Sequence, residues 1–505
     1  MFLAKVVKQN RLELFLFLPL LLTSFFFRFY KVSDYVVFLG DEGRDMLVLK
    51  SMIIDHKITF LGPTASVGGF YLGPIYYYMA TPFLALSHLN PVGPSYMVAI
   101  FGVLTVLLLF KILKETAGFY PAIMASFLYS TAPLIVRYSR SSWNPNPLPF
   151  FSLLLIYCLY LGITKGKLRY FVISGLCFGI AIQLHYLAAV LIGISGLIII
   201  LNTNFRKWHL IFLSSLSGFL VTFSPFLLFE IKHHFPNFIT IKEFVTRGTT
   251  VGYKTPNFLW QIPNIGNILL EEITKLIGTN VTRLVFWILT LGGFFGLAEG
   301  FQDKNKRAIF SIALIWFFGG LLGVRFYTGQ VFDYYFGFMF PAPFLLLGLT
   351  FKVAWQNKVL QIACVVFTLL ASIWFFDNAF FKSPPNRLIV QTKTVADFVI
   401  EKSENKPYNF GLISDHNSDH AYRYFLETEN HKPIALEKVI TDQLLVVCES
   451  KVCAPLGNPG WEIAGFGRAE IAGEWKIPDI GIKVYRLVHW PGAPSPAGKP
   501  AIKGV

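Results

Sequence analysis

Long apolar runs alternate with short polar segments over most of the chain, and this pattern predicts membrane-spanning helices. A helix needs about 20 mostly apolar residues to cross a bilayer. We expect a polytopic α-helical membrane domain over residues 1–380 with about 11 transmembrane helices. The expected spans lie near residues 12–30, 94–113, 118–136, 147–163, 169–184, 187–202, 208–229, 282–299, 308–324, 332–351 and 358–376.

The segment from Phe70 to Leu89 departs from this pattern. It is apolar and rich in tyrosine, but Pro74 and Pro82 interrupt it. Tyrosine is typical of the membrane–water interface, so we interpret the segment as an interfacial or re-entrant helix on the outer face. Two large outer loops then remain, at about 31–93 and about 230–281.

The composition and the distribution of charge support this topology. The chain is 54% hydrophobic and 14% charged, whereas soluble domains carry about 25% charged residues. Lys and Arg collect in cytoplasmic loops, so the net charge of +15 needs no nucleic-acid partner. Lys5, Lys8 and Arg11 place the N-terminus in the cytoplasm of a multi-pass cell-membrane protein. The later clusters then also fall on the cytoplasmic side: Lys111/Lys114, Lys165/Lys167/Arg169, Arg206/Lys207, Lys304/Lys306/Arg307 and Lys352/Lys358.

After the last predicted span the chain becomes polar and mixed. "RLIVQTKTVADFVIEKS" has helical spacing, whereas "YNFGLIS", "DQLLVVCES" and "IGIKVYRL" read as strands. We therefore expect a small extracytoplasmic α/β domain over 384–490, followed by a disordered Pro/Gly/Ala-rich tail over 491–505. Cys448 and Cys453 could form a disulfide outside the cell, and two unpaired thiols fit the sequence equally well.

The motif "GDEGRD", from Gly40 to Asp45, places three carboxylates and Arg44 in the first outer loop, beside the membrane. Such dense charge at this level indicates a functional site. Carboxylates as close as Asp41, Glu42 and Asp45 raise one another's pKa, whereas the N-terminal end of a helix lowers it. The sequence does not decide which effect is larger.

Other unusual polar residues fall at the same predicted membrane level. They are Arg140 and Asn144 in "RYSRSSWNPNPLPFF", His185 in "AIQLHYL", Arg325, and Tyr334 and Tyr335 in "FDYYF". A carboxylate at this boundary can take the proton from an acceptor hydroxyl or amine, and arginines can bind a phosphate leaving group. The pattern favours group transfer from a lipid phosphate, because nucleotide sugars are not available outside the cell.

Four motifs resemble those of the GT-C fold polyprenyl-phosphate-sugar glycosyltransferases, of the protein O-mannosyltransferase and aminoarabinose transferase type. "GDEGRDMLVLKSMI" resembles the acidic motif of that family's first outer loop. "YLGPIYYYMATPFLAL" is similar to its aromatic segment, with Leu72 and Gly73 in place of a lysine and a proline. "RYSRSSWNPNPLPFF" is similar to its arginine-containing turn, where Asn144 or Asn146 replaces a frequent aspartate, and "DYYFGFMFPAPFLLLG" is similar to a Tyr-x-x-Pro helix. The resemblance covers roughly residues 10–380.

This resemblance implies a GT-C-like fold and a polyprenyl-phosphate-linked sugar donor. It makes Asp41 the general base of an inverting transfer, with Glu42 or Asp45 helping to hold the acceptor or to tune Asp41. It implies no cofactor and no metal, since the "WWDYG" motif of metal-dependent oligosaccharyltransferases is absent. The remaining roles are donor-phosphate binding for Arg140, Arg325 and Arg44, and pocket lining for His185, Asn144, Tyr334, Tyr335 and Tyr76.

Two alternative functions remain open. An O-antigen or polysaccharide polymerase or ligase also acts outside on lipid-linked glycans, but its large functional loop usually comes late in the chain. A transporter would show an internal repeat and polar groups at mid-membrane, and neither is evident in the sequence. The sugar, the polyprenyl length and the acceptor, whether lipid, glycan or protein, are not identified.

Overall fold

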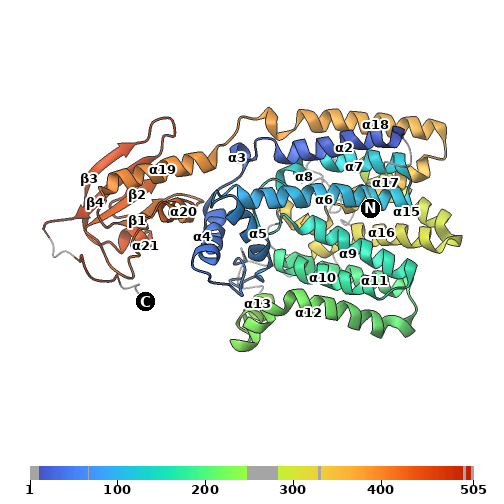
Figure 1. The fold of residues 1–505 in the computed structure, drawn as a ribbon, viewed down its shortest axis with the longest axis horizontal. Coiled ribbons are helices and arrows are strands. Elements are labelled where there is room, and N and C mark those ends of the chain that lie inside the picture. Colours follow the sequence, from blue (N-terminus) through green and yellow to red (C-terminus); the bar gives the residue numbers. More distant parts are fainter. Residues whose placement is uncertain (1–10, 66–67, 247–282, 328–330, 493–495, 502–505) are drawn as a thin grey trace. The chain divides into compact units, whose positions relative to one another are not determined.

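The computed structural model describes residues 11–65, 68–246, 283–327, 331–492 and 496–501 (Figure 1). Lys5, Lys8, most of the second predicted outer loop and parts of the predicted tail lie outside these residues. The chain forms two compact units, which are described separately. The helical unit comprises Met1–Val32, Ile58–Phe83 and Pro94–Pro384, and the C-terminal unit comprises Ser33–Lys57, Leu84–Gly93 and Pro385–Val505. The acidic motif therefore belongs to the C-terminal unit, although the predicted boundary lay near residue 380.

Each of the predicted spans contains a helix in the structure. These helices are α2 (Arg11–Phe29), α6 (Gly93–Thr116), α7 (Phe119–Thr131), α9 (Leu148–Lys165), α10 (Arg169–Leu184), α11 (Val190–Asn202), α12 (Trp208–Lys232), α15 (Arg283–Glu299), α16 (Lys304–Arg325), α17 (Ala342–Ala354) and α18 (Lys358–Asp377). Shorter helices are α8 (Pro133–Tyr138), α13 (Pro236–Thr246) and the 3-10 turns η1 (Tyr186–Ala189), η2 (Phe205–Lys207), η4 (Gly300–Gln302), η5 (Asp333–Met339) and η6 (Phe380–Lys382).

Five helices in the described part of the chain are long and apolar enough to cross a membrane, or six if the bent pair of η5 and α17 is one span. The predicted number of eleven spans is thus not confirmed. Helix α10 has 16 residues and α11 has 13, so both are short for a bilayer.

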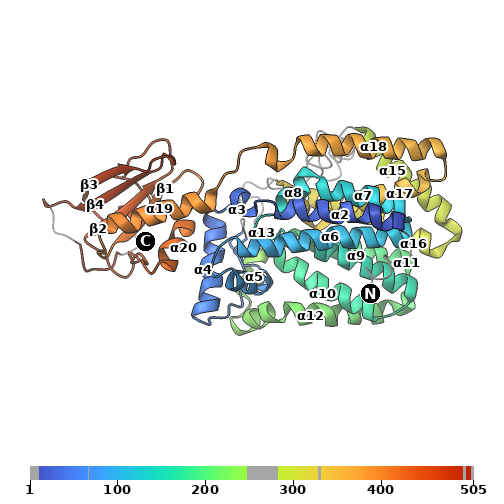
Figure 2. The ribbon, with the colours of Figure 1, turned by 45° about the horizontal axis from the view of Figure 1, so that its top comes forward.

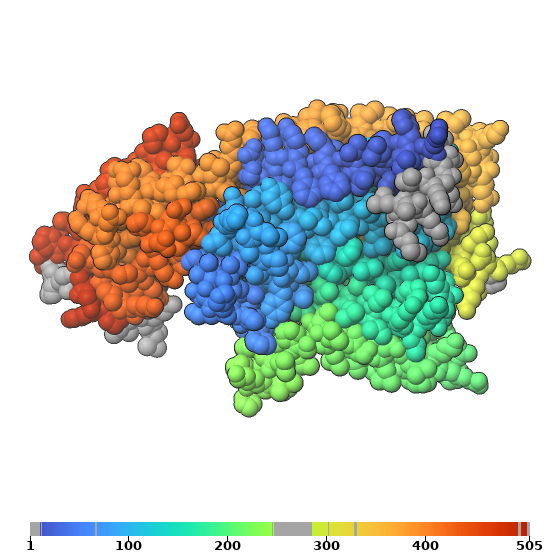
Figure 3. All heavy atoms as spheres, in the orientation of Figure 1, coloured from blue at the N-terminus to red at the C-terminus, as the bar shows by residue number. Residues whose placement is uncertain are grey.

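Helices α12 and α18 lie at opposite edges of the helical unit in Figures 1 and 3. Only 17% of the apolar window of each is buried. Large apolar side chains such as Phe212 and Val221 on α12, and Leu369 and Ile373 on α18, are exposed. Apolar surfaces of this extent are typical of lipid contact.

The sequence fixes several helix ends locally. Asp303 accepts hydrogen bonds from the backbone amides of Asn305 and Lys306 at the start of α16, and Asn357 caps α18 in the same way. Gly166 ends α9 in the left-handed conformation, with φ of 65°. Helix α10 approaches α12 closely at Gly175, where a Cβ would lie 1.8 Å from the Ser215 carbonyl oxygen.

The segment predicted to be interfacial contains α5 (Ile75–Leu86), a helix of 12 residues with Pro82 inside it. At 1.5 Å per residue its length is about 18 Å, well short of the roughly 30 Å hydrocarbon core of a bilayer. Helix α5 is therefore too short to be a membrane span, as the proline-interrupted sequence predicts.

The C-terminal unit contains a four-stranded sheet in the order β1-β2-β4-β3. Its strands are β1 (Asn409–Ile413), β2 (Gln443–Cys448), β3 (Ala469–Lys476) and β4 (Lys483–His489), and its helices are α19 (Leu388–Ser403), α20 (His420–Thr428), α21 (Trp461–Ala464) and α4 (Gly40–Ile54). The short helix α3 (Val32–Tyr35) begins at the boundary between the units. Strands β1 and β2 are parallel and the other pairs antiparallel, and Figure 2 shows α19 and α20 beside the sheet.

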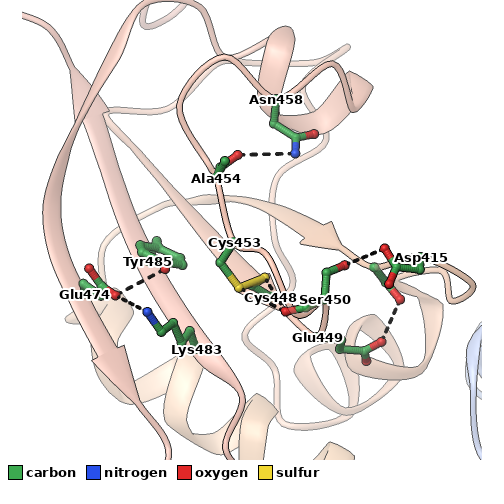
Figure 4. The surroundings of a disulfide bond; sticks show 11 residues. Asp415, Cys448, Glu449, Ser450, Cys453, Ala454, Asn458, Glu474, Lys483 and Tyr485 are labelled. Carbon is green, nitrogen blue, oxygen red and sulfur yellow. Dashed lines mark hydrogen bonds and ion pairs between the residues drawn. A yellow bond between two sulfur atoms is a disulfide. The ribbon is translucent and has the colours of Figure 1, made fainter.

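The C-terminal tail and the cysteine pair of this unit can be compared with the sequence predictions. Residues near the C-terminus are ordered by backbone pairing, since the amide of Gly498 donates to Ile440, and Ile440 donates to Lys499, both at 2.8 Å. This part of the tail therefore departs from the predicted disorder. Cys448 and Cys453 form a disulfide directly after β2 (Figure 4), so the paired alternative is the one observed.

Candidate active site

Helix α4 begins with the acidic motif. One carboxylate and one side-chain amide accept hydrogen bonds from the backbone amides at its start. Glu42 Oε2 accepts a hydrogen bond of 3.0 Å from the backbone N–H of Leu39. Leu39 precedes the helix and has no polar side chain, so it cannot cap the helix itself. Asn417 Oδ1 instead accepts from the N–H of Gly40 at 2.9 Å.

The two glycines of the motif allow α4 to approach α20 closely. A Cβ on Gly43 would lie 2.2 Å from the backbone nitrogen of Ala421. A Cβ on Gly40 would lie 1.9 Å from Ser418 Oγ. The spacing of glycine within "GDEGRD" therefore serves packing, while the acidic residues between them take up different environments.

The three carboxylates of the motif differ strongly in exposure. The Asp41 side chain is 56% exposed, Asp45 is fully buried and Glu42 is 6% exposed. Arg44 pairs with Asp41 Oδ1 and with Asp45 Oδ1, each at 3.0 Å. Asp41 is consequently the carboxylate of the motif that a dissolved or membrane-bound acceptor can reach.

Burial raises the pKa of Glu42 to about 7. Hydrogen bonds from the backbone amides of Leu39 and Glu42 oppose this shift, and the charges of Asp45 and Asp41 add to it. Repulsion between the carboxylates and hydrogen bonds from the start of the helix therefore both act on the pKa of Glu42. Desolvation is a larger effect on this pKa than either of them.

The structure adds residues beside the motif that sequence reasoning missed. His420, at the first position of α20, lies within the electrostatic influence of Asp41 and Arg44, and burial lowers its pKa. The Ser418 hydroxyl lies 2.9 Å from His420 Nδ1. Asn417 and His420 follow the motif by more than 370 positions, and no motif or spacing in the sequence links them to it.

In the helical unit, several predicted pocket residues gather in an aromatic cluster formed by Trp143, His185, Tyr186, Tyr327, Phe332, Tyr334 and Tyr335. The ring centroids of Tyr334 lie 4.4 Å from Trp143 and 4.7 Å from Tyr335. His185 lies 5.1 Å from Tyr335 and stacks on Tyr186 at 4.6 Å. Aromatic faces with polar edges are well suited to hold a sugar ring.

Hydrogen bonds fix the position of His185. Asn144 Nδ2 donates to the carbonyl oxygen of Leu184 at 2.7 Å, which ties the "NPNP" segment to the end of α10. The Nδ1 atom of His185 accepts from the N–H of Leu187 at 3.2 Å. A neutral imidazole that accepts at Nδ1 carries its proton on Nε2, so His185 presents a donor at that atom.

Arg140 is placed differently from the expectation of a donor-phosphate ligand. Its Nη1 and Nη2 donate to the carbonyl oxygens of Phe27 and Tyr30, each at 2.7 Å, at the end of α2. Its guanidinium also lies 3.6 Å from the ring centroid of Phe380. These contacts hold the Arg140 guanidinium at the end of α2, and its binding to a donor phosphate stays a prediction.

The two remaining predicted site residues are Arg325 and Tyr76. Arg325 is half-buried at the last position of α16, two residues before Tyr327 of the aromatic cluster. Tyr76 is completely buried, with its ring centroid 5.9 Å from that of Tyr77. Over the described ranges, no three His, Cys, Asp or Glu side chains are grouped so as to hold a metal ion. Transfer without a metal stays a prediction.

The acidic motif and the aromatic cluster lie in different units, and the structure describes each group by itself. The first offers an exposed carboxylate with a paired arginine. The second offers aromatic faces and a fixed histidine. Sequence reasoning selected residues from both.

A known protein family matches the part of the chain that contains two of the four motifs. Residues 72–229 match the model of the family described as dolichyl-phosphate-mannose-protein mannosyltransferase. This range includes nearly all of the aromatic segment of the predicted first outer loop and the arginine-containing turn. No curated protein matches the chain significantly in sequence.

Solved structures match nearly the whole chain. The crystal structure of ArnT from Cupriavidus metallidurans bound to undecaprenyl phosphate has 14% identity and a TM-score of 0.56, over 96% of this chain and 99% of that one. The same enzyme in the apo state has 13% identity and a TM-score of 0.57, over 94% and 97%. The Archaeoglobus fulgidus oligosaccharyltransferase, tethered with an acceptor peptide, has 13% identity and a TM-score of 0.51, over 94% and 74%. The chain therefore has the fold of these GT-C glycosyltransferases, and its resemblance to those that use polyprenyl-phosphate sugars is confirmed.

Proposed function

We propose that this protein is a membrane glycosyltransferase that moves a sugar from a polyprenyl-phosphate donor to an acceptor hydroxyl or amine on the extracytoplasmic face. The fold is shared over 96% of the chain with ArnT, which was solved with undecaprenyl phosphate. The apolar, exposed surfaces of α12 and α18 support a place within the bilayer, where such a donor is found.

The observation that carries the proposal is the unequal exposure of the carboxylates in the acidic motif. Glu42 and Asp45 are buried, whereas Asp41 is 56% exposed. A general base must reach the proton that it abstracts, so Asp41 is the candidate base. Glu42 and Asp45 are then the residues that shape the start of α4 and hold Arg44.

The reaction follows from these groups. The acceptor O–H or N–H gives its proton to the Asp41 carboxylate while the acceptor atom attacks the anomeric carbon of the sugar. The bond from that carbon to the phosphate oxygen breaks, and the polyprenyl phosphate leaves with the electron pair. A single displacement from the opposite face inverts the anomeric configuration. Cationic side chains stabilise the leaving phosphate, and we assign this role first to Arg325 and next to Arg44.

The aromatic cluster is the proposed sugar-binding wall. Tyr334, Tyr335 and Trp143 offer ring faces, and His185 offers an Nε2–H donor for a sugar hydroxyl. The disulfide between Cys448 and Cys453 supports an extracytoplasmic C-terminal unit, because disulfides persist in oxidising compartments. The eleven-span topology with a cytoplasmic N-terminus remains our proposal for the whole chain.

The test is transfer of label from a panel of polyprenyl-phosphate sugars in membranes that contain the protein. Asp41→Asn is compared with Asp55→Asn, an identical change at the other end of α4 where the carboxylate is 50% exposed. We expect wild type and Asp55→Asn to transfer label, and Asp41→Asn to be about 10²- to 10⁴-fold slower. Normal transfer by Asp41→Asn would disprove the assignment of the base, and absence of transfer in wild type from every donor would disprove the function.

A further inference from the structure

The start of α4 is held by a side chain from the far end of the sequence. Asn417 Oδ1 accepts from the N–H of Gly40 and from the N–H of Ser418, both at 2.9 Å. Gly40 immediately precedes Asp41. Because Leu39 offers no side-chain acceptor, the amide of Gly40 depends on Asn417 for its hydrogen bond.

Glu449 fixes the orientation of the Asn417 amide. Asn417 Nδ2 donates to both carboxylate oxygens of Glu449, at 3.0 and 3.1 Å. The same carboxylate accepts from the Tyr422 hydroxyl at 2.6 Å and from the Ser414 hydroxyl at 2.9 Å. Since Nδ2 is directed at a carboxylate, Oδ1 must face Gly40, and the two ends of the amide cannot exchange.

Glu449 itself is held at the end of strand β2 in the C-terminal unit. It follows Cys448, the last residue of β2, and its backbone amide donates to the Ile413 carbonyl oxygen at 2.9 Å. Figure 4 shows Glu449 and Ser450 within the turn closed by the Cys448–Cys453 disulfide, with Ser450 bonded to Asp415. These contacts connect the C-terminal end of strand β2 to the first turn of α4.

We propose that Asn417, oriented by Glu449, is a positioning residue for Asp41: the C-terminal unit sets where the candidate base lies. The inference rests on the proposed function. Asp41 is exposed and follows Gly40 directly, so a rotation or fraying of the first helical turn moves its carboxylate while leaving the packed part of α4 in place. Displacement of a catalytic group by about 1 Å can cost about 10²-fold in rate.

The test exchanges donor and acceptor between the two side chains. In Asn417→Asp, an acceptor for Gly40 remains, but a second carboxylate faces Glu449. In the double variant Asn417→Asp/Glu449→Gln, the glutamine amide can donate to the new aspartate, so the bond re-forms with reversed polarity. We expect Asn417→Ala and Asn417→Asp to lower kcat for sugar transfer at least tenfold with the donor KM unchanged, and the double variant to recover most of this loss.

A matched control separates positioning from loss of stability. Asn409 is a fully buried asparagine of this unit that bridges backbone groups outside α4, donating to Ile434 and Val439 at 2.8 and 3.0 Å. Asn409→Ala is expected to lower the melting temperature but to keep kcat in the folded fraction. Equal loss of kcat in Asn409→Ala and Asn417→Ala, or no recovery in the double variant, would overturn the inference.

Hydrogen–deuterium exchange of the peptide that contains Gly40 gives a readout that is independent of activity. We expect at least tenfold faster exchange in Asn417→Ala than in wild type and little change in Asn409→Ala. If wild type transfers sugar and Asn417→Ala matches it in kcat and in exchange, the inference fails while the proposed function stands. If wild type transfers nothing, the proposed function fails, and the exchange alone decides whether Asn417 holds the motif.

Discussion

Arg44 forms an ion pair of 3.0 Å with Asp45, the fully buried carboxylate of the acidic motif. The same guanidinium forms a second pair of equal length with Asp41, which is largely exposed. An exposed pair contributes about 0–1 kcal/mol, whereas removing one partner from a buried carboxylate costs about 3–5 kcal/mol. Arg44 therefore stabilises the fold chiefly through Asp45. The ion pair with Asp41 contributes little to the free energy of unfolding.

This asymmetry predicts different effects on stability for neighbouring substitutions. We expect Arg44→Gln to lower the free energy of unfolding by about 3 kcal/mol, and Arg44→Gln/Asp45→Asn to recover at least half of that loss. Asp41→Asn is expected to cost less than about 1 kcal/mol. Thermal melting of the purified protein in lipid nanodiscs measures all three. A larger loss in Asp41→Asn than in Arg44→Gln would contradict the assignment.

The raised pKa of Glu42 predicts a dependence of stability on pH. With a pKa of about 7 in the folded protein and about 4.5 in the unfolded chain, the folded state binds more protons between these values. Stability is therefore expected to fall as the pH rises from about 4.5 to about 7, by on the order of 3 kcal/mol. Glu42→Gln keeps an oxygen acceptor for Leu39 and carries no charge, so we expect its stability to be nearly independent of pH in this window.

Melting temperatures between pH 5 and pH 8 test this prediction. The matched control is Glu401→Gln, an identical substitution at an exposed position of the same unit, which should follow the wild-type pH dependence. A Glu42→Gln variant that loses stability with pH as steeply as wild type would show that Glu42 is ionised throughout.

Much of the fold could be predicted because it is encoded locally. The apolar runs mark the helices of the helical unit, and strands β1, β2 and β4 are marked by buried runs such as "QLLVVC". Strand β3 was missed because it is an edge strand whose residues Ala469–Lys476 are mostly exposed and include charged residues and a glycine. The number of spans stays a prediction, since apolarity alone does not give the length of a helix.

The candidate site could be predicted only in part. Asp41 and Arg44 stand in one dense motif, so their proximity is visible in the sequence. Asn417 reaches the same motif across 377 positions, and nothing in the sequence indicates this contact. Arg140 was assigned to phosphate because of its residue type and predicted membrane level, but its hydrogen bonds to α2 depend on tertiary packing.

Close packing at Gly43 predicts a severe effect of a single methyl group. A Cβ there would meet the backbone of Ala421 at 2.2 Å, which no change of side chain can relieve. We expect Gly43→Ala to destabilise the protein by about 3 kcal/mol and to displace α4 from α20. At Gly40 the nearest atom is a serine hydroxyl, so Gly40→Ala/Ser418→Gly should be more stable than Gly40→Ala alone. Melting curves for the three variants decide this, and a tolerated Gly43→Ala would contradict the packing.

The contacts of Arg140 predict a structural role that differs from that of Arg325. Arg140→Ala leaves two carbonyls at the end of α2 without their donors, and we expect a loss of about 1–3 kcal/mol in stability with the donor KM unchanged. Arg140→Lys cannot replace the forked contact and should lose nearly as much. Arg325→Ala is expected instead to raise the donor KM at least tenfold. A raised donor KM in Arg140→Ala would restore the phosphate assignment of this residue.

The disulfide after β2 predicts a response to reductant that is confined to the C-terminal unit. The bond joins cysteines five positions apart, and chain entropy gives about 2 kcal/mol for so short a loop. We expect the double variant Cys448→Ser/Cys453→Ser and reduced wild type to melt at the same lowered temperature. Because Glu449 lies within the closed turn, both should also exchange the amide of Gly40 faster than oxidised wild type. Cys158, Cys177 and Cys364 are free and buried, so reductant should leave the double variant unchanged, and a further shift in that variant would contradict the assignment.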